Sequence, residues 1–232
     1  MMKSSVKIGT LIGISIEINY SWLVVFFLIT TMLATTYYPY FVPNIPEINY
    51  WVAAILSTIM IFLSLVLHEL SHSYVAIKND IQIKRITLFI FGGVAQMEKE
   101  PETALVEFKM AIAGPLCSLF LALLFFSIAK SLELFDINKL FGYVFYYLAI
   151  INTSIVIFNI IPGFPLDGGR VFRALIWHYN NNLRAATKFA TILGKIFAFM
   201  IMSIGLLMLA FSKFIDGLWF LVIGLFLHEA AD

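Results

Sequence analysis

Long apolar stretches separated by short polar segments make up most of this sequence. A helix needs about 20 apolar residues to cross a bilayer core of about 30 Å. We therefore predict an all-α polytopic membrane protein with six transmembrane helices. The predicted spans cover residues 21–38, 51–77, 110–129, 141–161, 191–210 and 214–227.

Two segments outside the spans have the composition of β-strands. Val6–Asn19 alternates and is rich in β-branched residues, which predicts a short strand pair at the N-terminus. Ile81–Met97, between spans 2 and 3, is also strand-like and is interrupted by Gly92-Gly93. Strand backbone near membrane depth is tolerated only against protein or along a cavity, so we expect this second segment to dip toward the bilayer. We predict a single membrane-embedded domain over residues 1–232, with its core at 51–175.

The composition supports a membrane protein and excludes several other classes. Hydrophobic residues make up 61% of the chain, charged residues only 12%, and the mean hydropathy is +0.94. Globular domains carry about 25% charged residues, so a soluble enzyme, a disordered chain and a nucleic-acid binder are all disfavoured. The net charge of +1 offers no electrostatic footprint for an acidic partner. The single cysteine, Cys117, cannot form an internal disulfide.

Basic residues are distributed unevenly between the two sides of the predicted membrane helices. Twelve of the fifteen Lys and Arg residues lie in the N-terminal arm, in the connections between spans 2 and 3 and between spans 4 and 5, or, for Lys195, at the start of the fifth span. The opposite side has only Lys130, Lys139 and Lys213. By the positive-inside rule, we expect a multi-pass protein of the cell membrane with both termini in the cytoplasm.

The second span contains the sequence His68-Glu69-Leu70-Ser71-His72, an H-E-x-x-H motif. On a helix the two imidazoles project from one face, about 6 Å apart along the axis, which suits two ligands of a tetrahedral zinc ion. Glu69 lies too far round the helix to share the metal easily and can instead act as general base on a metal-bound water. His68 is expected in the cytoplasmic third of the membrane, so the active site would open toward the cytoplasm.

Two histidines leave a zinc ion under-coordinated, and the segment after the fourth span offers a third ligand. Asp167 follows two prolines, which end the helix, and precedes Gly168 and Gly169, which permit an irregular backbone. His178 and His228 are the other histidines, and we interpret both as structural or solvated.

The His68–His72 motif, together with Asn159-x-x-Pro-x-x-Pro-x-Asp167-Gly-Gly, resembles the site-2 protease family of intramembrane zinc metalloproteases. Gly92-Gly93-Val94 and Ala113-Gly114-Pro115 also resemble that family, in its compact archaeal and bacterial branch with six spans and no PDZ insertion. The resemblance implies one zinc ion per chain. It implies His68, His72 and Asp167 as zinc ligands, Glu69 as catalytic base and acid, and Asn159, Gly92 and Gly93 as substrate-binding residues.

Alternatives to these substrate-binding roles remain: Asn159 can satisfy a helix end, the glycines can form a plain turn, and Asn152 can hydrogen-bond between helices. The hypothesis is an intramembrane endopeptidase that acts on a transmembrane segment of another membrane protein, with a helix-destabilised substrate and the lipid bilayer as partners. The alternative is a zinc transporter or metal-binding membrane protein. A transporter would carry further polar residues across the membrane, and the outer halves of these spans lack His, Asp and Glu.

Overall fold

The computed structural model describes residues 5–90, 92–212 and 214–231, and the chain divides into two compact units. Unit 1 comprises residues 1–100 and 116–156, and unit 2 comprises residues 101–115 and 157–232. The prediction of one membrane-embedded domain stays a prediction.

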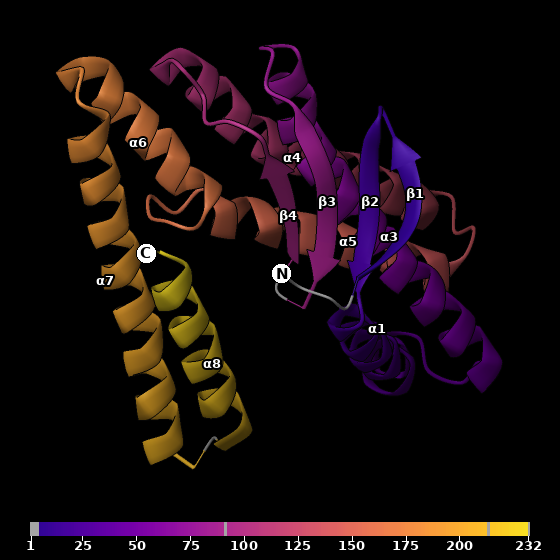
Figure 1. The fold of residues 1–232 in the computed structure, drawn as a ribbon. Helices are drawn as coiled ribbons and strands as arrows, with labels where there is room; N and C mark the ends of the chain where they lie inside the picture. The colour runs from indigo at the N-terminus through magenta and orange to yellow at the C-terminus, as the bar shows by residue number, and fades with distance from the viewer. Residues whose placement is uncertain (1–4, 91, 213, 232) are drawn as a thin grey trace. The chain divides into compact units, whose positions relative to one another are not determined.

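A four-stranded sheet in unit 1 is built from the two segments that were predicted to form strands (Figure 1). β1 pairs with β2 and β3 pairs with β4, both antiparallel, whereas β2 and β3 pair in parallel. Both strand predictions are confirmed, although Phe91, between β3 and β4, lies outside the described residues. The strands, in their order across the sheet, are β1 (Ser5–Leu11), β2 (Ile14–Asn19), β3 (Ile83–Phe89) and β4 (Gly92–Met97).

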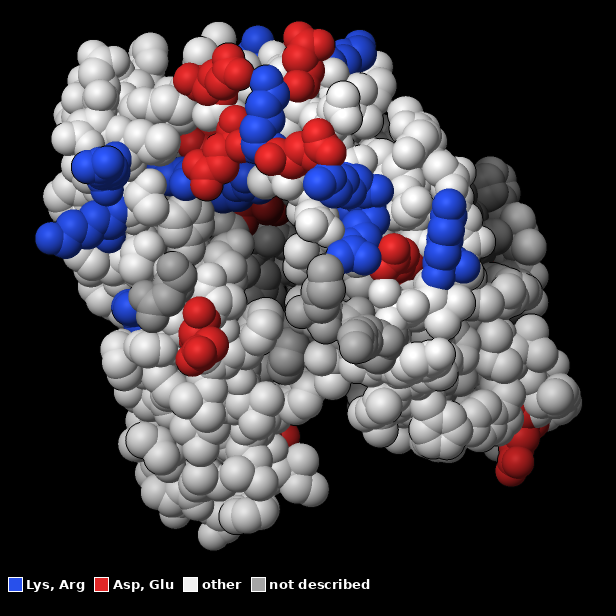
Figure 2. All heavy atoms as spheres, in the orientation of Figure 1, with Lys and Arg blue, Asp and Glu red and all other residues white. Residues whose placement is uncertain are grey.

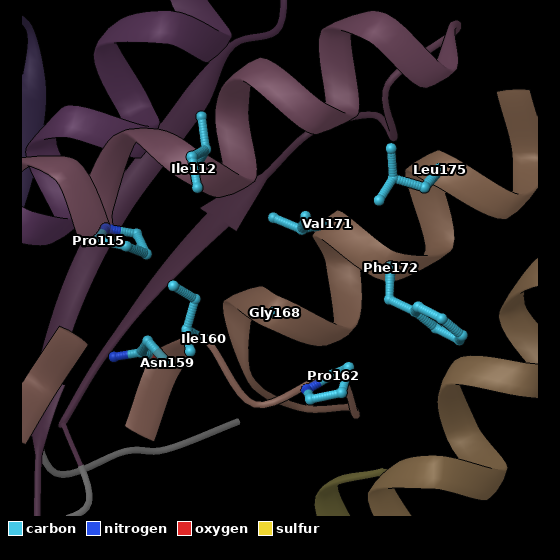
Figure 3. Close-up of a pocket in the computed structure, with 9 residues that line it drawn as sticks. All are labelled: Ile112, Pro115, Asn159, Ile160, Pro162, Gly168, Val171, Phe172 and Leu175. Atoms are coloured by element: carbon cyan, nitrogen blue, oxygen red, sulfur yellow. The ribbon is translucent and has the colours of Figure 1, made fainter. Parts of the chain in front are cut away.

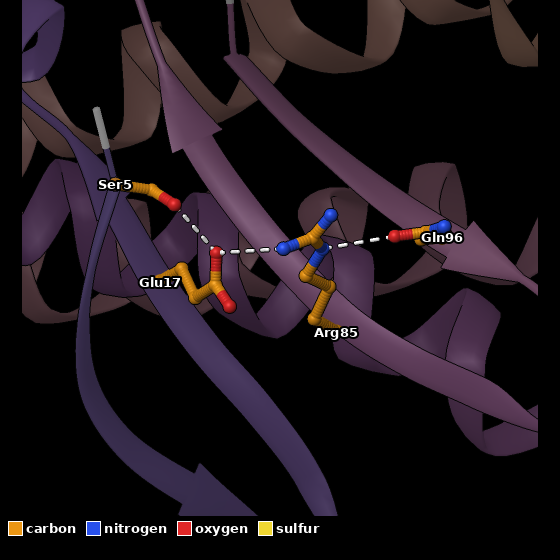
Figure 4. A network of polar contacts seen from close by, with 4 residues as sticks. All are labelled: Ser5, Glu17, Arg85 and Gln96. Atoms are coloured by element: carbon orange, nitrogen blue, oxygen red, sulfur yellow. Dashed lines mark hydrogen bonds and ion pairs between the residues drawn. The ribbon is translucent and has the colours of Figure 1, made fainter. Parts of the chain in front are cut away.

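A polar network on one face of this sheet links all four strands (Figure 4). Glu17 on β2 accepts a hydrogen bond from Ser5 Oγ at 2.6 Å and faces an Arg85 guanidinium nitrogen at 3.5 Å. Arg85 Nε donates in turn to Gln96 Oε1 at 2.9 Å, and these two residues are directly opposed across β3 and β4. Cross-strand pairs of this kind fix the register of neighbouring strands.

The helices of unit 1 pack around a core that is rich in small and aromatic residues. Tyr38 and Ala54 are fully buried in it, and the Tyr38 hydroxyl lies 2.5 Å from Ser57 Oγ. Two of these helices, α4 and α5, cross the boundary into unit 2. The helical elements are α1 (Ser21–Met32), the π-helical η1 (Leu33–Tyr37), α2 (Tyr38–Phe41), α3 (Glu47–Ile77), α4 (Ala104–Leu134) and α5 (Lys139–Asn159).

Unit 2 contains three further helices, α6 (Asp167–Asn180), α7 (Leu183–Ala210) and α8 (Phe214–Ala230). α7 and α8 lie side by side in opposite directions (Figure 1). Their shared core contains Ala198, Ile201 and Leu227, and Leu166 packs against it from the connection before α6.

Within the part of the chain that the structure describes, five helical segments are long and apolar enough to cross a membrane, by length and composition: residues 21–41, α3, α4, α5 and α7. They match the first five predicted spans, and the sixth corresponds to α8, whose 17 residues extend about 26 Å. Large apolar side chains are exposed on these helices, for example Phe27 at 68%, and uncharged surface dominates the space-filling view (Figure 2). Such surface suits lipid rather than water, so the chain is a helical membrane protein with a short β-sheet.

Candidate metal centre

The two histidines of the H-E-x-x-H motif lie one turn apart on α3 and face each other. His68 is 3% exposed and His72 is 9% exposed, and their Nε2 atoms are separated by 3.2 Å. The ring centroids lie 4.9 Å apart with a nearly perpendicular orientation. Two electron-pair donors therefore converge on one point on the buried face of a long, predominantly apolar helix.

The spacing of these nitrogens suits a shared zinc ion. Zinc binds imidazole at about 2.0–2.1 Å, so two ligands of a tetrahedral site have nitrogens about 3.3 Å apart. The separation of 3.2 Å between the two Nε2 atoms agrees with that value. The histidine pair fits zinc with no change in helix geometry.

Ser118 on α4 holds the other nitrogen of the His68 ring. Its Oγ lies 2.9 Å from His68 Nδ1, and its side chain is completely buried. Binding a metal through Nε2 requires the tautomer whose Nδ1–H donates to an acceptor, which is the usual arrangement around metal-ligating histidines. Ser118 was not predicted from the sequence, because it is fifty residues from His68 and lies in a largely apolar helix with two other serines, Ser127 and Ser131.

Glu69 lies against strand β4, and Gly93 makes this contact possible. A methyl group at position 93 would lie 2.5 Å from Glu69 Cγ and 3.1 Å from Glu69 Oε1. Only a residue without Cβ allows the strand backbone to approach the carboxylate this closely. β4 is also an edge strand of the sheet, so an extended chain that paired with it would run close to Glu69.

Asn152, on α5, is buried and takes part in an interhelical contact. Its Nδ2 donates to Ser64 Oγ on α3 at 3.2 Å and to the Leu148 carbonyl at 2.9 Å. The expectation that Asn152 hydrogen-bonds between helices is therefore confirmed. This contact ties α5 to α3 one turn before His68.

Asp167 is the first residue of α6 in unit 2, and it is half-buried. The prediction that Gly168 and Gly169 mark irregular backbone is wrong, because both lie in the first turn of α6. The irregular backbone is the preceding connection, residues 160–166. A methyl group at Gly169 would collide with the backbone of Gly163 and Phe164, so this glycine serves close packing of the helix against the connection.

Asn159 ends α5 and lines a cavity of about 160 Å³ in unit 2 (Figure 3). The other lining residues are largely apolar and include Ile112, Val171 and Phe172. The role of Asn159 in substrate binding stays a prediction, as does that of Gly92, which starts β4 with a φ of 131°.

The predicted residues are thus divided between the two units. His68, Glu69, His72, Gly92 and Gly93 lie in unit 1. Asn159 and Asp167 lie in unit 2, so the complete three-ligand set stays a prediction. His178 is exposed and the His228 ring packs on Phe199 at 5.2 Å, in line with their interpretation as solvated or structural residues.

Comparison with known proteins identifies relatives along almost the whole chain. Residues 56–137 and 128–204 match peptidase family M50. A protein of Synechocystis sp. that is named as a zinc metalloprotease is 33% identical over 231 residues, and a zinc metalloprotease of Methanocaldococcus jannaschii is 38% identical over 175 residues. These alignments cover 99% and 75% of this chain but only 59% and 48% of the relatives.

A solved structure resembles the whole chain. The site-2 protease from Methanocaldococcus jannaschii superposes with a TM-score of 0.65 at 32% sequence identity. The match covers 98% of this chain and 93% of the solved chain. The fold class predicted from the sequence is therefore confirmed.

Proposed function

Because this chain belongs to peptidase family M50, whose relatives are zinc metalloproteases, we propose that it is an intramembrane zinc endopeptidase. Its reaction would be the hydrolysis of a peptide bond within or near a transmembrane segment of another membrane protein, as in regulated intramembrane proteolysis. The observation that carries the proposal is the His68–His72 pair, whose Nε2 atoms lie 3.2 Å apart in a membrane-spanning helix beside Glu69.

One zinc ion per chain would be held by His68, His72 and Asp167. Two imidazoles and one carboxylate are a donor set that catalytic zinc sites use, with a fourth position left open. When bound, zinc supplies a Lewis acid that lowers the pKa of a coordinated water and polarises a carbonyl.

Glu69 would transfer the proton. Its carboxylate takes a proton from water as the water oxygen attacks the scissile carbonyl carbon, and passes it to the amide nitrogen as the C–N bond breaks. Asn159 is proposed to donate a hydrogen bond to the substrate backbone or to the developing oxyanion.

The substrate would have to be unwound before it is cut. A helix in lipid satisfies all its backbone groups internally, and its carbonyls are shielded from attack. The open edge of β4, held against Glu69 at Gly93, offers hydrogen-bond partners to an extended strand. We therefore propose substrates whose transmembrane segment contains Gly, Pro or Asn near its cytoplasmic end.

The cytoplasmic position of both termini and of the site opening is also part of the proposal. It is supported by the twelve basic residues on one side of the predicted spans. An epitope inserted after Asn181, in the connection between α6 and α7, should be protected from protease added outside intact cells.

The decisive experiment is Glu69→Gln in the purified full chain. Zinc content should stay near one ion per chain, while cleavage of a helix-destabilised transmembrane peptide should fall by at least about 100-fold. Full activity of the variant would contradict the role of Glu69. Zinc flux in proteoliposomes that survives this substitution would favour the transporter instead.

A further inference from the structure

Unit 2 contains a buried ion pair whose two residues take no direct part in the proposed peptide-bond hydrolysis. Arg173 on α6 donates from Nε to Glu107 Oε1 at 2.6 Å, and a second guanidinium nitrogen contacts the same oxygen. Glu107, near the start of α4, is 1% exposed, and Arg173 is 7% exposed. Both charges are thus almost completely removed from solvent.

Arg173 also contacts the connection that leads into α6. Its guanidinium carbon lies 5.2 Å from the centre of the Phe164 ring, a cation–π geometry. Phe164 precedes Asp167 by three residues and Arg173 follows it by six. The Arg173 guanidinium therefore links three segments, namely the start of α4, the connection before α6, and α6 itself. Asp167 lies in the sequence between Phe164 and Arg173.

The backbone around Asp167 leaves little room for displacement. Phe164 N–H donates to the Ala190 carbonyl of α7 at 3.2 Å. A Cβ at Gly169 would overlap the backbone of Gly163 and Phe164, so helix and connection are in direct contact. A shift of the connection relative to α6 would break these contacts and move the Asp167 carboxylate.

A contribution to folding stability does not by itself explain why Glu107 and Arg173 are buried together. Replacing a buried ion pair by apolar residues of similar volume is often neutral or stabilising, because desolvation offsets the attraction. Glu107 Oε2 adds to this cost, because it is buried and has no hydrogen-bond partner among the described residues. The pair is better explained by the geometry that it imposes.

We propose that Glu107 and Arg173 are positioning residues that hold Asp167 where its carboxylate can complete the zinc site. They act through Phe164 and through the first turns of α6, without touching the reacting atoms. This inference rests on the proposed function in one respect, namely that Asp167 is a zinc ligand.

The test is zinc affinity, measured by competition with a chelator on the full chain in detergent or lipid. In the double variant Glu107→Leu with Arg173→Met, the buried charges are removed together and the fold is expected to be retained. Zinc should bind about 10- to 100-fold more weakly, as is typical when an outer-shell partner is lost. A Co²⁺-loaded sample should also show altered visible absorption, because the ligand geometry has changed.

Arg173→Lys provides a second variant that keeps the positive charge. Lysine lacks the planar fork that serves Glu107 and the flat surface that stacks on Phe164. We expect zinc affinity between those of the wild type and the double variant. This variant decides the question if the double variant does not fold.

Lys130→Met is the matched control. It breaks the exposed ion pair with Glu133, in which Lys130 Nζ lies 2.8 Å from the carboxylate, and it should leave zinc affinity unchanged. Wild-type affinity in Arg173→Lys, or in a folded double variant, would overturn the proposal. A wild-type chain that binds zinc but cleaves no peptide would contradict the proposed function while leaving this test valid.

Discussion

The histidine half and the aspartate half of the proposed zinc site are held in different ways. His68 and His72 belong to one helix, and the four-residue spacing places them on one face, where their Nε2 atoms lie 3.2 Å apart. Asp167 begins a helix after a connection without regular structure, and its placement depends on tertiary packing.

This difference shows which structural features fix the positions of the ligands in such a site. A helix supplies two ligands at the correct separation at no extra cost, because 3.6 residues per turn align positions i and i+4. A ligand at the end of a connection needs further contacts, which here are the glycine packing and the ion pair of Glu107 with Arg173. The histidine half needs only a hydrogen bond to orient one ring.

The largest effect should come from removing a ligand from either half. His72→Ala and Asp167→Ala should each weaken zinc binding by more than the roughly 10- to 100-fold typical of outer-shell partners, and peptide cleavage should be lost. Metal analysis after dialysis against a weak chelator measures this. His178→Ala is the control, since His178 is exposed and should not affect zinc. Retention of zinc by Asp167→Ala alone would show that the aspartate half is not part of the site.

A smaller effect is expected from Gly93→Ala, which leaves both halves intact and disturbs Glu69, the proposed base. The new methyl would lie 2.5 Å from Glu69 Cγ, so the flexible side chain must move. A displacement of about 1 Å can cost up to about 100-fold in rate, so kcat should fall by about 10- to 100-fold with zinc content unchanged. Gly9→Ala in the same sheet is a matched control, since a Cβ there meets no atom within 4 Å. If Gly93→Ala and Gly9→Ala had equal kcat values, the contact between β4 and Glu69 would have no part in catalysis.

The smallest effect should come from Ser118→Ala, which removes the hydrogen bond to His68 Nδ1. Zinc affinity should fall by about 10-fold, the lower end of the range for outer-shell partners, because the helix still positions the ring. Ser127→Ala controls for the substitution itself, since Ser127 is exposed on the same helix and its hydroxyl donates to the Leu123 carbonyl. If Ser118→Ala weakened zinc binding as much as the double variant of Glu107 and Arg173 does, the histidine half would depend on tertiary contacts as strongly as the aspartate half.

Much of the fold and the histidine half could be predicted because they depend on local patterns. Apolar runs predicted six spans, of which five correspond to the long apolar helices of the described residues. Alternation predicted strands within residues 6–19, and strand-like composition predicted strands within residues 81–97. The parallel pairing of β2 with β3 was not predicted, because it joins segments separated by the first two spans. The motif at His68 was readable because helical periodicity determines its geometry.

The supporting contacts could not be predicted because their partners are distant in the sequence. Ser118 lies fifty residues from His68, and Glu107 lies sixty-six residues from Arg173. Gly168 and Gly169 were misinterpreted for a different reason. A glycine pair is compatible both with irregular backbone and with a helix packed tightly against its neighbour, and only the tertiary structure distinguishes them.

Residues 5–19 shield one edge of β3. β2 pairs with that edge, and β1 pairs with the far edge of β2. A truncated chain that began at residue 20 would leave the β3 edge that pairs with β2 without a partner strand. Other polypeptides could then form β-sheet hydrogen bonds with that edge. Such a truncation should therefore promote self-association of the protein and divert extended chains from the edge of β4 beside Glu69.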